Sequence, residues 1–284
     1  MGWRNGLAVM VVWSLMVGLT ACGEAEGEHR MGGKEDEKRS APVVEAEAVP
    51  AREKREWQSD YRIRVPQEWG EQVTGVVSRI QTSEQAIALT LDACGGDQGS
   101  GYDRELVEFL RKQEVPATLF INKRWLEANP KTLEELASDP LFTIENHGTE
   151  HRPLSINGRS VYGITGTPNV EAVVEEIEEN QRAISERTGR KPRFFRSGTA
   201  YYDEVAVEIA SELGVKVIHF DVVGDAGATW SAEEVERALM ASRPGSIIIL
   251  HMNQPHSGTA EGVIRAVPRL QEQGFRFVKL DEYL

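Results

Sequence analysis

Two histidines four residues apart are the clearest sign of chemistry in this sequence. His147 and His151 are separated by a glycine, a threonine and a glutamate, and side chains at this spacing on a helical turn or a tight loop reach one point. Neutral imidazole is a good ligand for Zn²⁺ and its first-row relatives. The apolar run at residues 141–144 predicts a buried strand just before the pair. We therefore expect a metal site beyond the C-terminal end of a strand, although two solvated loop histidines would show the same spacing.

Further polar side chains stand where other predicted strands end: Asp92, Arg196, Asp221, Asp225 and His251. In a (β/α) barrel the C-terminal ends of the strands converge on one rim. An aspartate, an arginine and a histidine beside two metal-spaced histidines are the parts of a metal-dependent hydrolase. A histidine can also end a strand as a core residue, but the run before His251 is so apolar that we expect this ring to face a pocket.

The elements that would position these side chains alternate between apolar strand-like runs and helical patterns, which predicts an α/β fold. The predicted strands are residues 86–91, 117–121, 141–144, 193–195, 215–220, 246–250 and 275–278. Each is followed by a helix or a loop. We expect an incomplete or distorted (β/α) barrel of about seven parallel strands rather than an open sheet.

The predicted helices have recognisable ends and faces. Ser231 followed by Glu234 is a capping box, in which each residue satisfies a free backbone amide of the first turn. Glycines 189, 214 and 274 stand where helical patterns stop and supply a left-handed residue there. From residue 170 to 184, valines and isoleucines recur at helical spacing and predict one buried stripe. The glutamates between them are expected to face water.

The N-terminal region predicts export. Residues 1–21 contain one early cation, a short apolar core and small residues at the end, which is typical of a secretory signal. The ending Leu19-Thr20-Ala21-Cys22 resembles the lipobox of bacterial lipoproteins, in which the cysteine is acylated. We therefore expect a protein that is exported and lipid-anchored through Cys22 to a bacterial membrane, facing the periplasm or cell wall. An ordinary signal peptide with an incidental cysteine is the alternative.

Composition divides the rest of the chain. Residues 22–55 are charged and poor in large apolar side chains, which predicts a disordered linker starting at Cys22. Residues 56–84 are expected to form an N-terminal extension packed on the main domain, which spans residues 85–284. The net charge of −13 argues against a nucleic-acid partner. With only two cysteines, one of them expected to carry lipid, the fold must depend on its core.

From residue 85 to 284 the chain resembles the polysaccharide deacetylases with a NodB-homology domain, carbohydrate esterase family four. Five segments resemble the family motifs in the family's order: Thr90-Leu91-Asp92-Ala93, residues 147–151, Phe195-Arg196-Ser197-Gly198, residues 221–225 and Ile249-Leu250-His251. The resemblance implies a TIM-barrel-like NodB-homology fold. It also implies that His147 and His151 bind a metal ion and that Asp92 is the catalytic base.

The resemblance gives three further residues a role. Arg196 would hold the base, His251 would be the catalytic acid, and an aspartate of residues 221–225 would orient that acid. Asp225 is our choice for that aspartate, and Asp221 is the alternative. The implied cofactor is a divalent ion, with zinc expected and cobalt, nickel or manganese as alternatives.

The main departure from the family is Ala93, which stands where the family has a second, metal-binding aspartate. Asp92 could move onto the metal, Asp97 could reach in from the loop after two glycines, or two histidines and water could suffice. We expect Asp92 to take this place because it directly ends the strand. A single cysteine such as Cys94 is more often a small packed residue than a ligand.

These observations predict a metal-dependent hydrolase that removes N-acetyl groups from an amino-sugar polymer, such as peptidoglycan or another N-acetylglucosamine polysaccharide. In this mechanism the metal polarises the carbonyl, Asp92 takes a proton from water and His251 protonates the leaving amine. O-deacetylation of a polysaccharide is the near alternative. A catalytically decayed, carbohydrate-binding lipoprotein is the alternative from another functional class.

Overall fold

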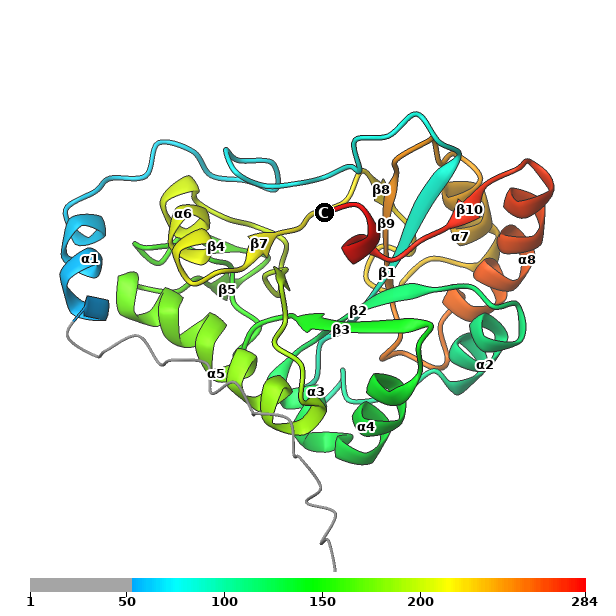
Figure 1. The fold of residues 1–284 in the computed structure, drawn as a ribbon, viewed down its shortest axis with the longest axis horizontal. Coiled ribbons are helices and arrows are strands. Elements are labelled where there is room, and N and C mark those ends of the chain that lie inside the picture. Colours follow the sequence, from blue (N-terminus) through cyan, green and yellow to red (C-terminus); the bar gives the residue numbers. More distant parts are fainter. Residues whose placement is uncertain (1–52) are drawn as a thin grey trace, which may run out of the picture. The chain divides into compact units, whose positions relative to one another are not determined.

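A curled parallel sheet carries the fold of this computed structural model, which describes residues 53–284 (Figure 1). The strand order is β7-β6-β3-β2-β1-β9-β8, β10 pairs with β1, and all of these pairs are parallel. The strands are β1 (Ala86–Ala93), β2 (Ala117–Ile121), β3 (Phe142–Asn146), β6 (Phe194–Phe195), β7 (Lys216–Val217), β8 (Val222–Val223), β9 (Ile247–His251) and β10 (Arg276–Phe277). The seven strands of this path form a half-barrel with β7 and β8 at its ends, which confirms the predicted incomplete (β/α) barrel.

Strand β1 lies at the centre of the sheet because its sequence is suited to burial on both faces. All eight of its residues are buried, and it pairs with β2 on one side and β9 on the other. Central strands of parallel sheets are covered on both faces, so they read as nearly continuous apolar runs. The first predicted strand therefore appears at its expected place, extended by two residues at its C-terminal end.

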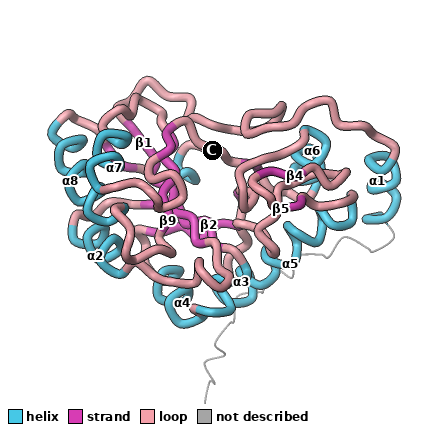
Figure 2. Tube along the Cα trace, turned by 180° about the vertical axis from the view of Figure 1, so that it is seen from behind, coloured by secondary structure: helices cyan, strands magenta, loops and turns pink. Residues whose placement is uncertain are grey.

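Helices follow most strands and cover the sheet (Figures 1 and 2). They are α1 (Glu53–Arg62), α2 (Arg104–Lys112), α3 (Lys123–Ala128), α4 (Pro130–Ser138), α5 (Val170–Thr188), α6 (Glu204–Glu212), α7 (Ala232–Leu239), α8 (Thr259–Glu272) and the 3₁₀ helix Leu280–Glu282. The largest core cluster packs residues of β1, β2 and β9 against α2, α4, α7 and α8. Among residues 53–284, no helix is both long and apolar enough to cross a bilayer.

The sequence signals at helix ends are confirmed. Ser231 Oγ accepts a hydrogen bond from the amide of Glu234, and Glu234 accepts one from the amide of Ser231, which completes the capping box. The three glycines that we expected at helix stops all have positive φ, between 68° and 88°. The valine and isoleucine stripe of α5 is buried.

One expectation about α5 is wrong. Glu176 does not face water: it is 3% exposed. Its carboxylate accepts backbone amide hydrogen bonds from the loop after β3, as described below. These bonds, rather than bulk water, solvate the group.

The structure adds elements that the sequence did not reveal. A short hairpin, β4 (Ser160–Val161) and β5 (Ile164–Thr165), turns at Tyr162 and Gly163, and β8 joins the edge of the sheet beside β9. Each of these strands has only two residues, too few for a periodic pattern to stand out. The strand expected at 215–220 is also short: β7 covers Lys216–Val217, and Ile218 beyond it forms an isolated bridge with Val77.

The segment after α1 lies along the edge of the domain (Figure 1). It forms isolated bridges between Gly70 and Tyr202, and between Arg79 and Ser246. The carboxylate of Glu204, at the start of α6, accepts the amides of Gln67 and Glu68 at 2.7 and 2.8 Å. The predicted signal peptide, the predicted lipidation site Cys22 and residues 22–52 of the predicted linker lie outside the described residues.

Candidate active site

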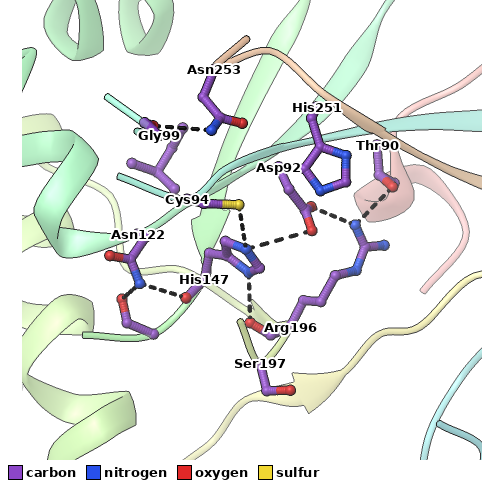
Figure 3. A network of polar contacts seen from close by, with 12 residues as sticks. Thr90, Asp92, Cys94, Gly99, Asn122, His147, Arg196, Ser197, His251 and Asn253 are labelled. Carbon is purple, nitrogen blue, oxygen red and sulfur yellow. Dashed lines mark hydrogen bonds and ion pairs between the residues drawn. The ribbon is translucent and has the colours of Figure 1, made fainter. Parts of the chain in front are cut away.

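Strand β1 delivers alternate side chains to two different environments. Leu91 and Ala93 belong to the hydrophobic core cluster. Thr90 and Asp92 instead accept hydrogen bonds from Arg196, and the Cys94 thiol that follows points toward His147 (Figure 3). Residues two apart on a strand share a face. The site is therefore built on the even-numbered residues of β1, and Ala93 faces away from it.

Arg196, which follows β6, is a fully buried cation beneath the site. Its Nη1 donates to Asp92 Oδ1 at 2.7 Å and to Thr90 Oγ1 at 2.9 Å. The other guanidinium donors go to the carbonyls of Ile218 and His219, both at 3.2 Å. Because these bonds fix the guanidinium, its charge stays beside Asp92.

Asp92 is held as an anion in a buried place. Burial opposes its ionisation, but the charges of Arg196, His147 and His251 outweigh that effect and lower the pKa of Asp92 below its usual value. Its Oδ1 is engaged by Arg196, while its Oδ2 lies 3.6 Å from His147 Nε2 and faces the site. This oxygen is the one that could accept a proton.

His147 follows β3 and is oriented by a backbone carbonyl. Its Nδ1 lies 3.0 Å from the carbonyl oxygen of Arg196, which can only accept, so Nδ1 carries the hydrogen and Nε2 is left for another partner. Nε2 lies 3.7 Å from Cys94 Sγ and 3.6 Å from Asp92 Oδ2. Metal-binding histidines usually donate their other ring N–H to such a carbonyl or to a carboxylate.

His151 completes the pair in a strained conformation. Its φ of 62° is uncommon for a residue with a side chain. The His151 ring meets the edge of the His147 ring, with 4.9 Å between ring centroids, and its buried Nε2 has no hydrogen-bond partner. Gly198 makes the space: a Cβ at that position would lie 2.3 Å from Cγ of His151. A side chain at position 198 would therefore displace the His151 ring.

The loop that carries both histidines is held by Glu176 of α5. Its carboxylate accepts the amides of Thr149, Glu150 and Arg152 at 2.9–3.2 Å. Burial raises the pKa of Glu176 to about 7 in spite of these bonds. Sequence reasoning missed this residue, although its position three residues after Val173 places it near the buried stripe.

His251, at the end of β9, is paired with Asp225. Its Nδ1 lies 2.8 Å from Asp225 Oδ1, and its amide donates to Asp225 Oδ2 at 2.7 Å. Burial would lower the pKa of His251, but the charge and hydrogen bond of Asp225 raise it well above the usual value. The other candidate, Asp221, instead pairs with Arg79 and accepts the amide of Ile247. Asp225 is therefore the residue that orients His251.

The site lies at a cavity of about 630 Å³. Asp92, Cys94, His151 and His251 line it together with apolar and aromatic residues. Tyr162 of the β4–β5 hairpin and Val223 of β8 lie at its edge, and their side chains are 72% and 42% exposed. The two elements that sequence reasoning missed thus form part of the cavity wall.

The donor set suits a transition-metal ion. One ligand atom each from Cys94, His147 and His151 can be chosen so that all three lie within 4.8 Å of one another. Ligand atoms of a tetrahedral zinc site are roughly 3.5 Å apart, from bond lengths of about 2.0–2.3 Å, so a small closure would bring the three onto one ion. Asp92 is not a member of this cluster. Asp97, the other carboxylate considered from sequence, is exposed.

Comparisons with known proteins agree with this geometry. Residues 79–218 match the family model described as polysaccharide deacetylase. This match covers just under half of the chain. The peptidoglycan-N-acetylglucosamine deacetylase of Bacillus cereus is 24% identical over 217 residues, which cover 74% of this chain and 94% of that protein. The uncharacterised protein YlxY of Bacillus subtilis is 22% identical, and the match covers 66% of this chain but only 54% of YlxY.

Two solved structures have the same fold as this chain. BA3943 of Bacillus anthracis, described as a family pseudoenzyme, superposes with a TM-score of 0.61 at 21% identity, over 75% of this chain and 69% of that one. A Clostridium thermocellum acetyl xylan esterase in complex with cobalt gives a TM-score of 0.58 at 21% identity, over 70% of this chain and 89% of that one. At this identity the likeness shows the fold alone.

Proposed function

We propose that this protein is a metal-dependent N-deacetylase of an amino-sugar polymer such as peptidoglycan, tethered at the cell surface through Cys22. The observation that carries the proposal is the pair of opposed proton carriers in one cavity: Asp92 held by Arg196, and His251 held by Asp225. The lipobox-like sequence before Cys22 supports the tether.

Asp92 and His251 are held in opposite protonation states, one able to accept a proton and the other able to donate one. Arg196 keeps Asp92 ionised, so Asp92 can accept a proton from water. Asp225 keeps His251 protonated, so His251 can donate to a departing nitrogen. An amide needs both transfers, because its amine is a poor leaving group until it is protonated. A bound divalent ion would supply polarisation of the acetyl carbonyl and a lower pKa for water.

The cavity and the comparisons support a sugar substrate. The exposed ring of Tyr162 offers an apolar surface beside the polar groups, and it packs edge-on against Tyr201 at 5.6 Å between centroids. The B. cereus relative is named as acting on peptidoglycan N-acetylglucosamine. The same acid–base pair would also serve an acetyl ester, so O-deacetylation is the near variant.

A catalytically decayed, carbohydrate-binding protein is the second candidate, because one structural neighbour is described as a pseudoenzyme and Ala93 replaces a family ligand. A mutant of that neighbour is described as having restored enzymatic activity. In the present chain both proton carriers keep their partners, and a site without turnover has no need of two such pairs. These contacts favour the active enzyme.

The test is acetate release by the full-length protein with Zn²⁺ or Co²⁺. Substrates are peptidoglycan fragments, N-acetylated chitooligosaccharides and O-acetylated xylan. We expect acetate together with new free amines from one of the first two. Acetate from xylan alone would move the activity to O-deacetylation, and binding of a glycan without acetate from any substrate would support the decayed protein.

A further inference from the structure

The direction of side chains along β1 determines which residue can replace the missing aspartate. Ala93 is fully buried in the core cluster, whereas Asp92 and Cys94 stand on the face that carries the site. A carboxylate at position 93 would have to leave the core to reach the histidines. Cys94 reaches them from the strand end as it stands, because it is two residues after Asp92.

The Cys94 thiol lies at a distance from His147 that suits two ligands of one metal ion. Cys94 Sγ lies 3.7 Å from His147 Nε2, close to the roughly 3.5 Å that separates sulfur and nitrogen ligands on a tetrahedral zinc ion. His147 presents Nε2 because its Nδ1 is bound to the carbonyl of Arg196. The buried Nε2 of His151 lacks a hydrogen-bond partner, and an atom of that ring lies in the same cluster. A buried nitrogen without a partner is costly unless something else binds it.

Asp92 and Asp97, the two carboxylates considered from sequence as the third ligand, do not lie with the two histidines in this way. Asp92 gives Oδ1 to Arg196, and its Oδ2 approaches His147 but is not part of the three-atom cluster. Asp97 is exposed in the loop after two glycines. Among residues 53–284, Cys94 is the residue whose potential ligand atom lies within 4.8 Å of a ring nitrogen of both His147 and His151.

We infer that Cys94 is the third protein ligand of the metal ion, with His147 and His151, and that this thiolate makes the site selective for zinc. The inference rests on the proposed function for the presence of an ion. Binding converts the thiol to a thiolate and releases one proton to solvent, so the ion gains one anionic ligand. Thiolate favours zinc over manganese or magnesium, which prefer oxygen ligands. Asp92 is then free to act as the base alone.

The metal itself gives the test. The full-length Cys22→Ser chain contains Cys94 as its single thiol, and Co²⁺ is the probe. We expect one equivalent of Co²⁺ to bind, with a sulfur-to-cobalt charge-transfer absorption in the near ultraviolet and protection of the thiol from alkylation. Adding Cys94→Ala should abolish the absorption and weaken Co²⁺ and Zn²⁺ binding by at least about tenfold, as loss of a direct ligand requires. Mn²⁺ should bind far more weakly than Zn²⁺.

Two control variants separate the alternatives. Asp92→Asn and Asp97→Asn, each in the Cys22→Ser chain, should keep the absorption and the stoichiometry. Binding of Co²⁺ without a sulfur band, unchanged in Cys94→Ala, would overturn the thiolate ligand and leave the proposed function standing. Loss of the ion in Asp92→Asn but not in Cys94→Ala would move the third ligand to Asp92. A Cys22→Ser chain that binds neither Co²⁺ nor Zn²⁺ would contradict the metal dependence of the proposed function, and the thiolate site with it.

Discussion

The protonation of His251 depends chiefly on Asp225, with a smaller effect of Cys94 in the same direction. The carboxylate lies 2.8 Å from Nδ1 and raises the pKa of the buried ring, against the effect of burial. The charged form of a histidine with a raised pKa persists until the pH exceeds that pKa. If His251 is the acid, activity should therefore be lost on the alkaline side, at a pH above the usual histidine value.

Asp225→Asn removes this charge and should move the alkaline limb of the pH–rate profile to lower pH. Acetate release near neutral pH should fall by roughly 10- to 100-fold, within the range of general-acid contributions. Asp221→Asn is the matched control, because that carboxylate pairs with Arg79 rather than with His251. An alkaline limb that stays in place in Asp225→Asn would argue against His251 as the acid.

The sequence predicted the polar residues of the site better than the place of Cys94. Asp92, Arg196 and His251 stand out because each ends an apolar run. Cys94 was interpreted as a packing residue. The neighbouring sequence does not show that the side chains of residues 92 and 94 lie on the same face of β1, while that of residue 93 lies in the core. That information requires knowing where β1 ends, and strand ends are poorly defined by apolar runs.

At the scale of elements, α5 supports the histidine loop through Glu176. Burial raises the pKa of this carboxyl to about 7 from its ordinary 4.5. Because the folded state binds the proton more tightly than the unfolded state, Glu176 stabilises the fold most below its unfolded pKa. Its contribution declines between these two values and is constant above them.

Glu176→Gln should remove this dependence. We compare the free energy of unfolding of the wild type with that of the variant. As the pH rises from the unfolded to the folded pKa of Glu176, the wild type should lose about 3 kcal/mol relative to the variant, the amount that corresponds to the pKa shift. Denaturant unfolding of both proteins over this pH range measures it, and other titrating groups, such as Glu145, cancel in the difference. A difference that does not change with pH would show that the folded and unfolded pKa values of Glu176 are equal.

The elements that the sequence left out are those whose formation depends on neighbours. The two-residue strands β4, β5 and β8 contain β-branched residues but are too short to show a periodic pattern, and they form where a turn or the edge of β9 supplies partners. The long strands β1, β2 and β9 are apolar through most of their length, and these strands and β3 were predicted near their observed positions. The cavity wall, made in part by the short strands, was therefore beyond prediction.

At the scale of the whole molecule, the proposed lipid anchor should be separable from the proposed deacetylase activity. Cys22 lies outside the described residues, and residues 53–284 contain no helix suited to crossing a bilayer. Cys22→Ser removes the acyl acceptor, so the chain should move from the membrane fraction to the soluble fraction with its acetate release unchanged. A variant that remains in the membrane fraction would contradict the lipid anchor.

The most direct test of the account is the rate of acetate release by the full-length protein compared with Asp92→Asn at equal metal content. The substrate is an N-acetylated chitooligosaccharide or a peptidoglycan fragment, and bound zinc is measured in the same samples. We predict that both proteins hold one zinc ion and that the variant is slower by about 10²–10⁴-fold, the contribution of a general base. Equal rates in the two proteins, or no acetate from the zinc-loaded wild type, would contradict the proposed deacetylase.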